Sequence, residues 1–382
     1  METPTLPIKT EALLVPSPGS PFTLTPVLIQ NLRPDELLVE IQYSGLCHTD
    51  FLLRTNHLPN ITHPCIPGPR RHRPHPLPRS LRQRQDPLSR DTVLLSFTSC
   101  NTCSHCAQQS PTTKCKSMPL LNLSCARHDG TTAYTMLDGT TPVSGHFFGQ
   151  SSFARVAVVH ELSVVKIDIG EEEMGLYAPM GCGYQTGAGT ILNVLNPIAK
   201  TDTVVIFGMG SVGFAALMAA SLILGVEKVV AVDLIEEKLT LAQELGARWV
   251  INGSETKDVV GEVMKITGGR GVDFAVDTTG VGRVVQDMIE CLGQGGTAAS
   301  VGAPAPGVKI EVDAGSFFAR SKKGGWQFIP RLIQYHKEGK FPIERISKVY
   351  PVEEVEKAIS DMERGKVCGC SMLIRSLSDM ML

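Results

Sequence analysis

The feature that most constrains this chain is a set of three glycines, Gly208, Gly210 and Gly213, directly after the apolar run Thr203–Phe207. The run is long enough for one buried strand, and the small residues of Ser211–Leu224 predict a helix. In the G-x-G-x-x-G spacing, the first glycine permits a tight turn, the second lets a pyrophosphate approach the backbone, and the third lets helix and strand pack closely. The N–H groups at the helix N-terminus then face the phosphates. The pattern predicts a dinucleotide site.

An acidic residue follows where a nicotinamide dinucleotide needs one. A second apolar strand, Lys228–Val232, is predicted to end in Asp233, twenty residues after Gly213. A carboxylate there accepts hydrogen bonds from both ribose hydroxyls and repels a 2′-phosphate. The sequence therefore favours NAD over NADP.

Composition limits the class of protein. The 382 residues suffice for two domains, and 36 Lys plus Arg against 38 Asp plus Glu argue against a mainly nucleic-acid-binding protein. No apolar run approaches the ~20 residues of a membrane span, and the first seven residues lack the pattern of a secretory signal. Eleven cysteines in such a chain indicate reduced thiols and metal ligands rather than disulfides. We expect a cytoplasmic protein that binds neither nucleic acid nor membrane.

The pattern along the chain changes near residue 175. Before it, short β-rich runs at 37–43, 92–97 and 153–159 predict strands broken by Pro and Gly. After it, the predicted strands are 203–207, 229–232, 249–251, 272–276 and 297–301, and the helices 236–245, 258–266 and 283–292. This alternation is typical of an α/β fold, a doubly wound parallel sheet with helices on both faces. Amphipathic helices at 328–336 and 352–362 and a last short strand form a tail.

One segment, Pro69–Arg90, does not fit this organisation. Of its 22 residues seven are Arg and five are Pro, and none is Gly, Val or Ile. Proline removes the hydrogen-bond donors of a central strand, and the segment has too little apolar surface to drive burial.

Four cysteines, Cys100, Cys103, Cys106 and Cys115, have the spacing of a metal site. Close thiolates on tight turns occupy the corners of a zinc tetrahedron, and four of them leave no open position, so the site is structural. The alternative is an accidental cysteine cluster. His105, between two of these cysteines, is interpreted as a solvated loop residue.

Two further cysteines, Cys47 and Cys182, are dispersed. Cys47 begins Cys-His-Thr-Asp, and Cys182 lies in a glycine-rich run just before the nucleotide domain. Either alone is interpreted as a packed core residue. Together they suggest an open catalytic zinc site, which needs three protein ligands and a position for substrate oxygen. The third ligand is not evident.

These motifs together resemble the zinc-dependent medium-chain alcohol dehydrogenases, most closely the aryl- or benzyl-alcohol type, including fungal members. The resemblance covers nearly the whole chain, through motifs in family order at residues 45–50, 100–115, 181–187, 208–213, 328–330 and 339–342. It implies a β-rich, chaperonin-10-like (GroES-like) catalytic domain at 1–174 with a zinc lobe at 97–116. It also implies a Rossmann NAD-binding domain at 175–316, and a segment 317–382 that returns to the catalytic domain.

The resemblance implies roles around a catalytic zinc. Cys47 and Cys182 match the two thiolate ligands, Thr49 the hydroxyl that passes the substrate proton towards solvent, and Asp50 the carboxylate that orients a zinc-bound histidine. Thr49 and Asp50 also have a simpler interpretation, as helix-capping residues.

Four more positions match cofactor contacts of the family. His48 matches a contact to the pyrophosphate and Thr186 one near the nicotinamide, while Asp233 and Lys238 match the pair that binds ribose. Lys238 is alternatively a solvated helix lysine. The chemistry implied is hydride transfer between a primary alcohol and NAD, with zinc polarising the oxygen.

The chain departs from the family after Gly68. The family continues with His-Glu and further glycines, and that histidine is the third catalytic zinc ligand, whereas Pro69 and Arg70 stand here. Length is preserved while composition is not, so we hypothesise a local reading-frame shift or a misplaced splice boundary. His63, His72 or His75 would have to replace the ligand. A second departure is that Cys115 lies one residue late, with Lys114 where the family has cysteine.

Three hypotheses follow. The first is an alcohol dehydrogenase, impaired or inactive as written, acting on an aryl or allylic primary alcohol, in secondary metabolism. The second is a non-catalytic NAD-binding protein that keeps structural zinc. The third, a nucleic-acid-binding zinc protein with an arginine-rich arm, is disfavoured because the arm lacks aromatic residues. The resemblance also implies a homodimer or homotetramer.

Overall fold

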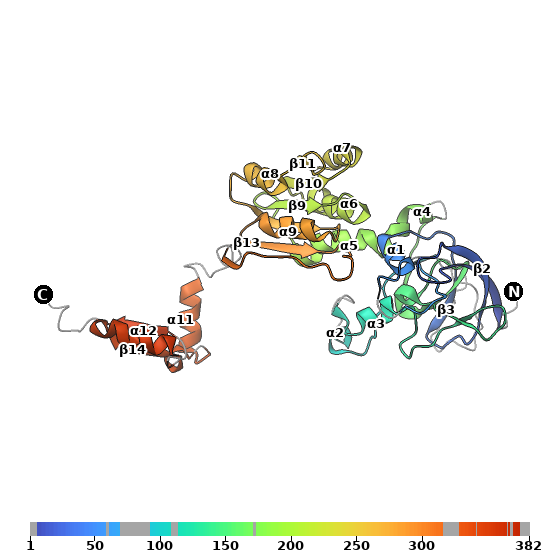
Figure 1. Cartoon of the computed structure of the whole chain (residues 1–382), viewed down its shortest axis with the longest axis horizontal. Coiled ribbons are helices and arrows are strands. Elements are labelled where there is room, and N and C mark those ends of the chain that lie inside the picture. The colour runs from blue at the N-terminus through green and yellow to red at the C-terminus, as the bar shows by residue number, and fades with distance from the viewer. Residues whose placement is uncertain are drawn as a thin grey trace. The chain divides into compact units, whose positions relative to one another are not determined.

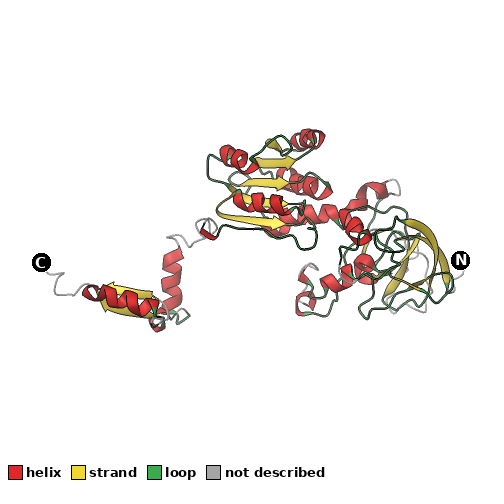
Figure 2. Cartoon of the chain, viewed as in Figure 1, coloured by secondary structure: helices red, strands yellow, loops and turns green. Residues whose placement is uncertain are grey.

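The computed structural model describes residues 6–58, 61–68, 92–107, 114–170, 173–315, 328–340, 342–364, 366 and 370–374. The chain forms two compact units, Met1–Ser321 and Lys322–Leu382. Figure 1 follows the chain between its termini, and Figure 2 marks its helices and strands. The first unit holds a strand-rich part followed by a parallel sheet covered by helices, and all site residues predicted above belong to it.

The strand-rich part is built from antiparallel pairs. Its four-stranded sheet contains, in this order, β1 (Ile8–Leu14), β2 (Thr23–Ile29), β5 (Tyr134–Thr135) and β6 (Pro142–Val143). Two further pairs are β3 (Glu36–Glu40) with β7 (Val156–His160), and β4 (Val93–Leu95) with β8 (Val164–Lys166). Buried side chains from these strands pack around Tyr134, whose hydroxyl accepts a hydrogen bond from the Val158 N–H at 2.7 Å.

A buried ion pair ties the start of β3 to a distant loop. The Arg127 and Glu36 side chains are only 6% and 4% exposed, and the guanidinium nitrogens lie 2.6 and 2.7 Å from the two carboxylate oxygens. The carbonyl groups of Asn31 and Thr132 accept further bonds from Arg127. A bidentate pair whose other donors are satisfied tolerates burial.

Short helices carry the predicted ligands. α1 (His48–Arg54) follows β3, α2 (Ser104–Ala107) lies within the cysteine lobe and carries Cys106, and α3 (Met118–Leu123) follows the lobe. α4 (Met174–Tyr177) and α5 (Gly183–Gly189) lead from the strand-rich part into the parallel sheet. Cys47 and Cys182 therefore both lie at helix starts.

The parallel sheet has the strand order β11–β10–β9–β12–β13. Its strands are β9 (Thr203–Phe207), β10 (Lys228–Asp233), β11 (Trp249–Asn252), β12 (Val272–Asp277) and β13 (Leu292–Ser300). The chain builds β10 and β11 on one side of β9 and then β12 and β13 on the other. The order reverses between β9 and β12, and ligands of open α/β sheets bind at the carboxyl ends of strands at such a point.

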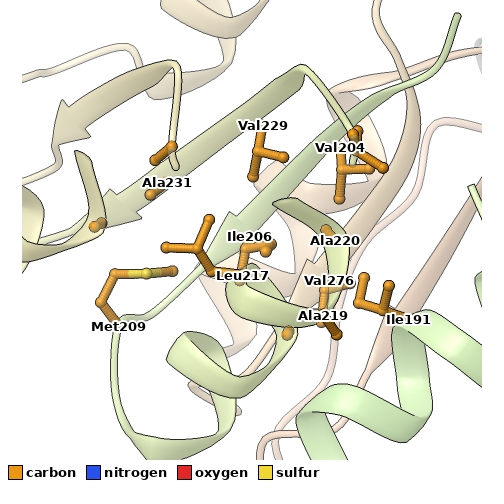
Figure 3. Packing of buried hydrophobic residues seen from close by; sticks show 14 of the residues in the cluster. Ile191, Val204, Ile206, Met209, Leu217, Ala219, Ala220, Val229, Ala231 and Val276 are labelled. Atoms are coloured by element: carbon orange, nitrogen blue, oxygen red, sulfur yellow. The ribbon is translucent and has the colours of Figure 1, made fainter. Parts of the chain in front are cut away.

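Helices cover both faces of this sheet. They are α6 (Ser211–Met218), α7 (Glu236–Glu244), α8 (Val259–Ile266) and α9 (Gly282–Glu290). Val204 and Ile206 of β9 pack with Leu217 of α6 (Figure 3), whereas Val205 and Phe207 pack in a second cluster with residues of α8 and α9. The doubly wound α/β fold predicted from the sequence is confirmed.

The predicted element boundaries differ most near residue 292. The helix predicted to run through residue 292 ends at Glu290, and Leu292 begins β13, which was expected to start at residue 297. Leu292 continues the helical spacing of apolar residues, but glycines at 293 and 295 follow, and glycine disfavours helix. The helix after the glycine turn is α-helical only to Met218 and continues as a π-helical turn, Ala219–Ile223.

The second unit is a small α/β assembly. β14 (Ser347–Pro351) pairs in parallel with β15 (Cys370–Ile374), and the helices are α11 (Ile329–Lys337) and α12 (Val355–Glu363). The buried Tyr350 hydroxyl donates to Asp361 of α12 at 3.0 Å. Among the described residues, no helix is both long enough and apolar enough to cross a membrane.

Candidate functional site

The three glycines form the turn between β9 and α6. Gly208 has φ +89°, a left-handed conformation that favours glycine. A Cβ on Gly213 would collide with the carbonyl oxygen of Gly208, so helix and turn pack too closely for any other residue. Gly210, by contrast, precedes α6 with open space where its Cβ would lie. The backbone is therefore accessible to a phosphate at Gly210, and the turn fits a dinucleotide.

Asp233 ends β10 beside this turn. Its Oδ2 accepts a hydrogen bond from the Met209 N–H at 2.6 Å, and its Oδ1 accepts from the N–H groups of Leu234 and Ile235 at 2.8 and 3.1 Å. The Nζ of Lys238 lies 3.8 Å from Oδ2. A carboxylate offers about four acceptor positions, so Asp233 holds the turn and keeps room for a ribose hydroxyl.

Two residues at the end of β12 also act on the turn, and sequence reasoning missed them. The Thr278 hydroxyl lies 2.9 Å from the Gly208 carbonyl oxygen, and the fully buried Asp277 carboxylate bonds the loop that carries Thr278. A signal was present, because polar residues directly after a buried central strand lie at the edge where ligands bind.

The four predicted lobe cysteines come together. All four sulfur atoms lie within 4.8 Å of one another, and Cys106 Sγ is 3.5 Å from Cys103 Sγ and 4.0 Å from Cys100 Sγ. Zn–S bonds of about 2.3 Å in a tetrahedron separate the sulfurs by about 3.8 Å. Cys115 completes the group, and the neighbouring Lys114 is not part of it.

Backbone hydrogen bonds lower the pKa of Cys100 and Cys103 and so favour their thiolate form, whereas burial raises the pKa of Cys106. The Thr102 backbone N–H and hydroxyl lower the pKa of Cys100 to about 5. The Cys103 N–H donates to Cys100 Sγ at 3.3 Å, and the Cys100 N–H donates to Cys115 Sγ at 3.3 Å. Since the thiolate is the metal ligand, this donor set fits a structural zinc.

Cys47 and Cys182 meet although they are far apart in the sequence. Their thiols share a hydrogen bond, which together with burial raises the pKa of Cys47. The Thr49 hydroxyl also bonds to Cys47. Thr186, on α5, donates its hydroxyl to the Cys182 carbonyl oxygen at 2.7 Å, which places Thr186 beside the thiol pair.

Asp50 has the capping role that was its simpler interpretation. It is fully buried, and its carboxylate accepts hydrogen bonds from the Cys47 N–H at 2.8 Å and from the Gly68 N–H at 3.1 Å. Burial raises the pKa of Asp50 to about 8. The carboxylate thereby joins the Cys47 loop to the place where the chain departs from the family.

The donor set for a catalytic zinc is incomplete in the part of the chain that the structure describes. Within that part, no third His, Cys, Asp or Glu joins Cys47 and Cys182 in a group of three. His63, which was considered as a replacement, instead has a buried Nε2 without a hydrogen-bond partner and is not in such a group. The His48 side chain and residues 69–91, with His72 and His75, lie outside the described residues. The described donors alone do not fit a catalytic zinc.

The features described so far are an accessible glycine turn at the switch point of the sheet, a four-thiol lobe and a partly buried thiol pair. Together they define a nucleotide-binding α/β protein with metal-type sites. Residues 211–324 match the family described as zinc-binding dehydrogenase. The chain is 33% identical to geraniol dehydrogenase of Castellaniella defragrans, over 94% of this chain and 96% of that protein. It therefore belongs to the medium-chain zinc-dependent alcohol dehydrogenases, whose members use NAD(H).

Solved structures agree with this assignment. An alcohol dehydrogenase zinc-binding domain protein from Burkholderia ambifaria is 35% identical with a TM-score of 0.72, covering 96% of this chain and all of the other. Benzyl alcohol dehydrogenase from Acinetobacter calcoaceticus is 31% identical with a TM-score of 0.70, at the same coverage. The chain is an alcohol dehydrogenase-type oxidoreductase by this membership.

Proposed function

We propose that the chain interconverts a primary alcohol of aryl or allylic type and its aldehyde by hydride transfer with NAD. The relatives named geraniol dehydrogenase and benzyl alcohol dehydrogenase support this substrate class, since geraniol is an allylic and benzyl alcohol an aryl primary alcohol. The observation that carries the proposal is the Asp233 carboxylate beside the glycine turn, in the same unit as the thiol pair.

NAD is the proposed cofactor rather than NADP. The pyrophosphate would lie over Gly210, where the backbone is open, and the adenosine ribose beside Asp233 and Lys238. A 2′-phosphate would meet the Asp233 carboxylate, and the cation beside it, Lys238, already lies 3.8 Å from that carboxylate and offsets its charge rather than that of a phosphate.

The reaction moves a hydride from the alcohol carbon to the nicotinamide and a proton from the hydroxyl to solvent. We assign Cys47 and Cys182 to the side of the site that faces the substrate oxygen. Thr49, whose hydroxyl is hydrogen-bonded to Cys47, is assigned to the path along which the proton leaves. His48 and Thr186 are assigned to the pyrophosphate and the nicotinamide. A metal at the thiol pair is not part of this proposal, because the described donors there do not complete a zinc site.

The wider assignments belong to the same proposal. Residues 1–174 would form the catalytic domain, 175–316 the NAD-binding domain, and 317–382 the segment that returns to the catalytic domain. The protein would act in the cytoplasm, in secondary metabolism, as a homodimer or homotetramer.

Steady-state assays on the full-length chain test the proposal. Benzyl alcohol and geraniol would each be offered with NAD and with NADP, and bound zinc would be counted on the same sample. Turnover with NAD, and much less with NADP, is the expected result. NADH binding without turnover, with one zinc per chain, would favour the alternative of a non-catalytic NAD-binding protein that retains structural zinc.

A further inference from the structure

One peptide bond of the glycine turn is held from both sides. The carbonyl oxygen of Gly208 lies 2.9 Å from Thr278 Oγ1, and the N–H of Met209, in the same peptide group, donates to Asp233 Oδ2 at 2.6 Å. The two partners follow β12 and end β10, the strands on either side of β9. Because the carbonyl and the N–H of a planar trans peptide point in opposite directions, the two bonds together fix the rotation of this group.

Thr278 is itself fixed against β9. Its N–H donates to the Phe207 carbonyl oxygen at 3.0 Å, and its hydroxyl lies 3.0 Å from the same oxygen. A Cβ on Gly208 would lie only 2.7 Å from Thr278 Oγ1, so the threonine is packed directly on the turn. The side chain therefore has a defined position relative to the first glycine.

The preceding residue, Asp277, sets the shape of the loop. Its carboxylate is fully buried and accepts four hydrogen bonds. They come from the Thr279 N–H at 2.9 Å, the Thr279 hydroxyl at 2.7 Å, the Gly280 N–H at 3.1 Å and the Ser300 hydroxyl at 2.9 Å. Hydrogen bonds to a charged acceptor are stronger than neutral ones, so Asp277 holds the loop that carries Thr278 and joins it to the end of β13.

We propose that Thr278 is a positioning residue for the pyrophosphate of the cofactor, and that Asp277 holds it in place. The orientation of the Gly208–Met209 peptide determines where the next N–H groups, those of Gly210 and Ser211, point at the start of α6. Those are the donors available to a pyrophosphate at a helix N-terminus. Thr278 acts through the turn and does not itself contact the cofactor. The inference rests on the proposed function, because it presumes that NAD occupies this turn.

Two substitutions at Thr278 distinguish the effect of the hydroxyl group on cofactor binding from the effect of the side-chain shape. Thr278→Val keeps the branched shape and removes the hydroxyl, whereas Thr278→Ser keeps the hydroxyl. Titration of the full-length protein with NADH, followed by fluorescence, is expected to show a Kd about tenfold higher in Thr278→Val, the loss of one useful hydrogen bond. The serine variant is expected to stay within about twofold of the parent protein.

A choice of ligands separates positioning from a general structural effect. ADP-ribose carries the pyrophosphate, whereas AMP has the same adenosine with a single phosphate. Thr278→Val should weaken the binding of ADP-ribose as much as that of NADH and leave the Kd of AMP unchanged. The titrations are made at a temperature at which all variants have the same circular dichroism spectrum. An equal rise in the Kd values of ADP-ribose and AMP would overturn the inference.

A matched pair of aspartates tests the role of Asp277. Asp273 lies near the other end of the same strand and also accepts a backbone N–H, from Thr203 at 2.8 Å. Asp277→Asn is expected to raise the NADH Kd, and Asp273→Asn to leave it unchanged. If the parent protein binds NADH but neither Thr278→Val nor Asp277→Asn alters the Kd, this inference alone fails. If the parent protein binds no NADH, the proposed function fails with it.

Discussion

The carboxylate of Asp233 lies 2.6 Å from the backbone nitrogen of Met209, so one side chain ends β10 and also holds the glycine turn. The position of Asp233 after the second strand predicts a preference for NAD over NADP. The structure adds that the same carboxylate accepts hydrogen bonds from three backbone N–H groups. Cofactor preference and the shape of the turn therefore depend on one residue.

Replacing Asp233 should not simply convert the protein to NADP. Asp233→Ala removes the repulsion of a 2′-phosphate but also releases the Met209 peptide. We expect the NADH Kd to rise by roughly 10- to 100-fold, equivalent to about 1.4–2.8 kcal/mol, without a gain in NADPH affinity. Fluorescence titration with both cofactors measures this, with the exposed Glu237→Ala of α7 as a control for lost charge. Tight NADPH binding by Asp233→Ala would contradict this role in the turn.

The cysteine lobe should hold one zinc independently of the catalytic site. Cys103→Ser removes one of four sulfurs that lie within 4.8 Å of one another. We expect the zinc content to fall by one per chain and the Tm to fall by about 5 °C or more, because metal binding stabilises the folded lobe. His105→Ala is the matched control, since His105 lies between two ligands but is exposed and outside the group. Metal analysis showing unchanged zinc in Cys103→Ser would remove the lobe as a zinc site.

Acid should destabilise the strand-rich part through His146. Its Nε2 accepts the Ala133 N–H at 3.2 Å, and burial lowers its pKa from 6.5 to about 3. Below pH 6.5 the unfolded chain therefore binds more protons at this position than the folded chain, so stability is lost as pH falls towards 3. The free energy of unfolding lost through His146 between pH 6.5 and pH 5 is about 1.6 kcal/mol.

A variant isolates this contribution from other titrating groups. His146 has φ +68°, which asparagine tolerates better than most residues. Between pH 6.5 and pH 5, the free energy of unfolding of His146→Asn should fall by about 1.6 kcal/mol less than that of the parent protein. Equal losses in the two proteins would show that His146 is not the titrating group.

The features that could be predicted from the sequence are those formed by residues close together in the chain. The glycine turn, Asp233 and the cysteine lobe were predictable, because each consists of neighbouring residues in a fixed spacing. The Thr278 hydroxyl bonds to Gly208 across 70 residues of sequence, and spacing carries no information about such a contact. Cys47 and Cys182 were suggested to share a zinc site from their residue type, and the family resemblance then implied it, but nothing in their spacing brings the two thiols together. The predicted boundary between helix and strand near Leu292 was wrong, because an apolar residue at helical spacing fits either element.

The unusual segment can be tested at the level of the gene. Residues 68–73 read Gly-Pro-Arg-Arg-His-Arg, and arginine is encoded by both CGN and AGR triplets. Read from the second nucleotide of the Gly68 codon to the first of the Pro74 codon, this run can encode Gly-His-Glu-Gly-Ile-Val, which contains the His-Glu pair that the family carries here. We expect sequencing of the transcript to show the shifted frame. Mass spectrometry of the native protein that finds the peptides of Pro69–Arg90 would refute the frame-shift hypothesis.

The most direct test of the proposed dehydrogenase activity is to follow the transferred hydride. Benzyl alcohol with deuterium at both carbinol positions would be incubated with NAD and the full-length protein, and the reduced cofactor examined by mass spectrometry. We predict one deuterium in each NADH formed, with benzaldehyde in equal amount. Tight NAD binding with no deuterated cofactor would contradict it, and would leave a nucleotide-binding protein without dehydrogenase chemistry.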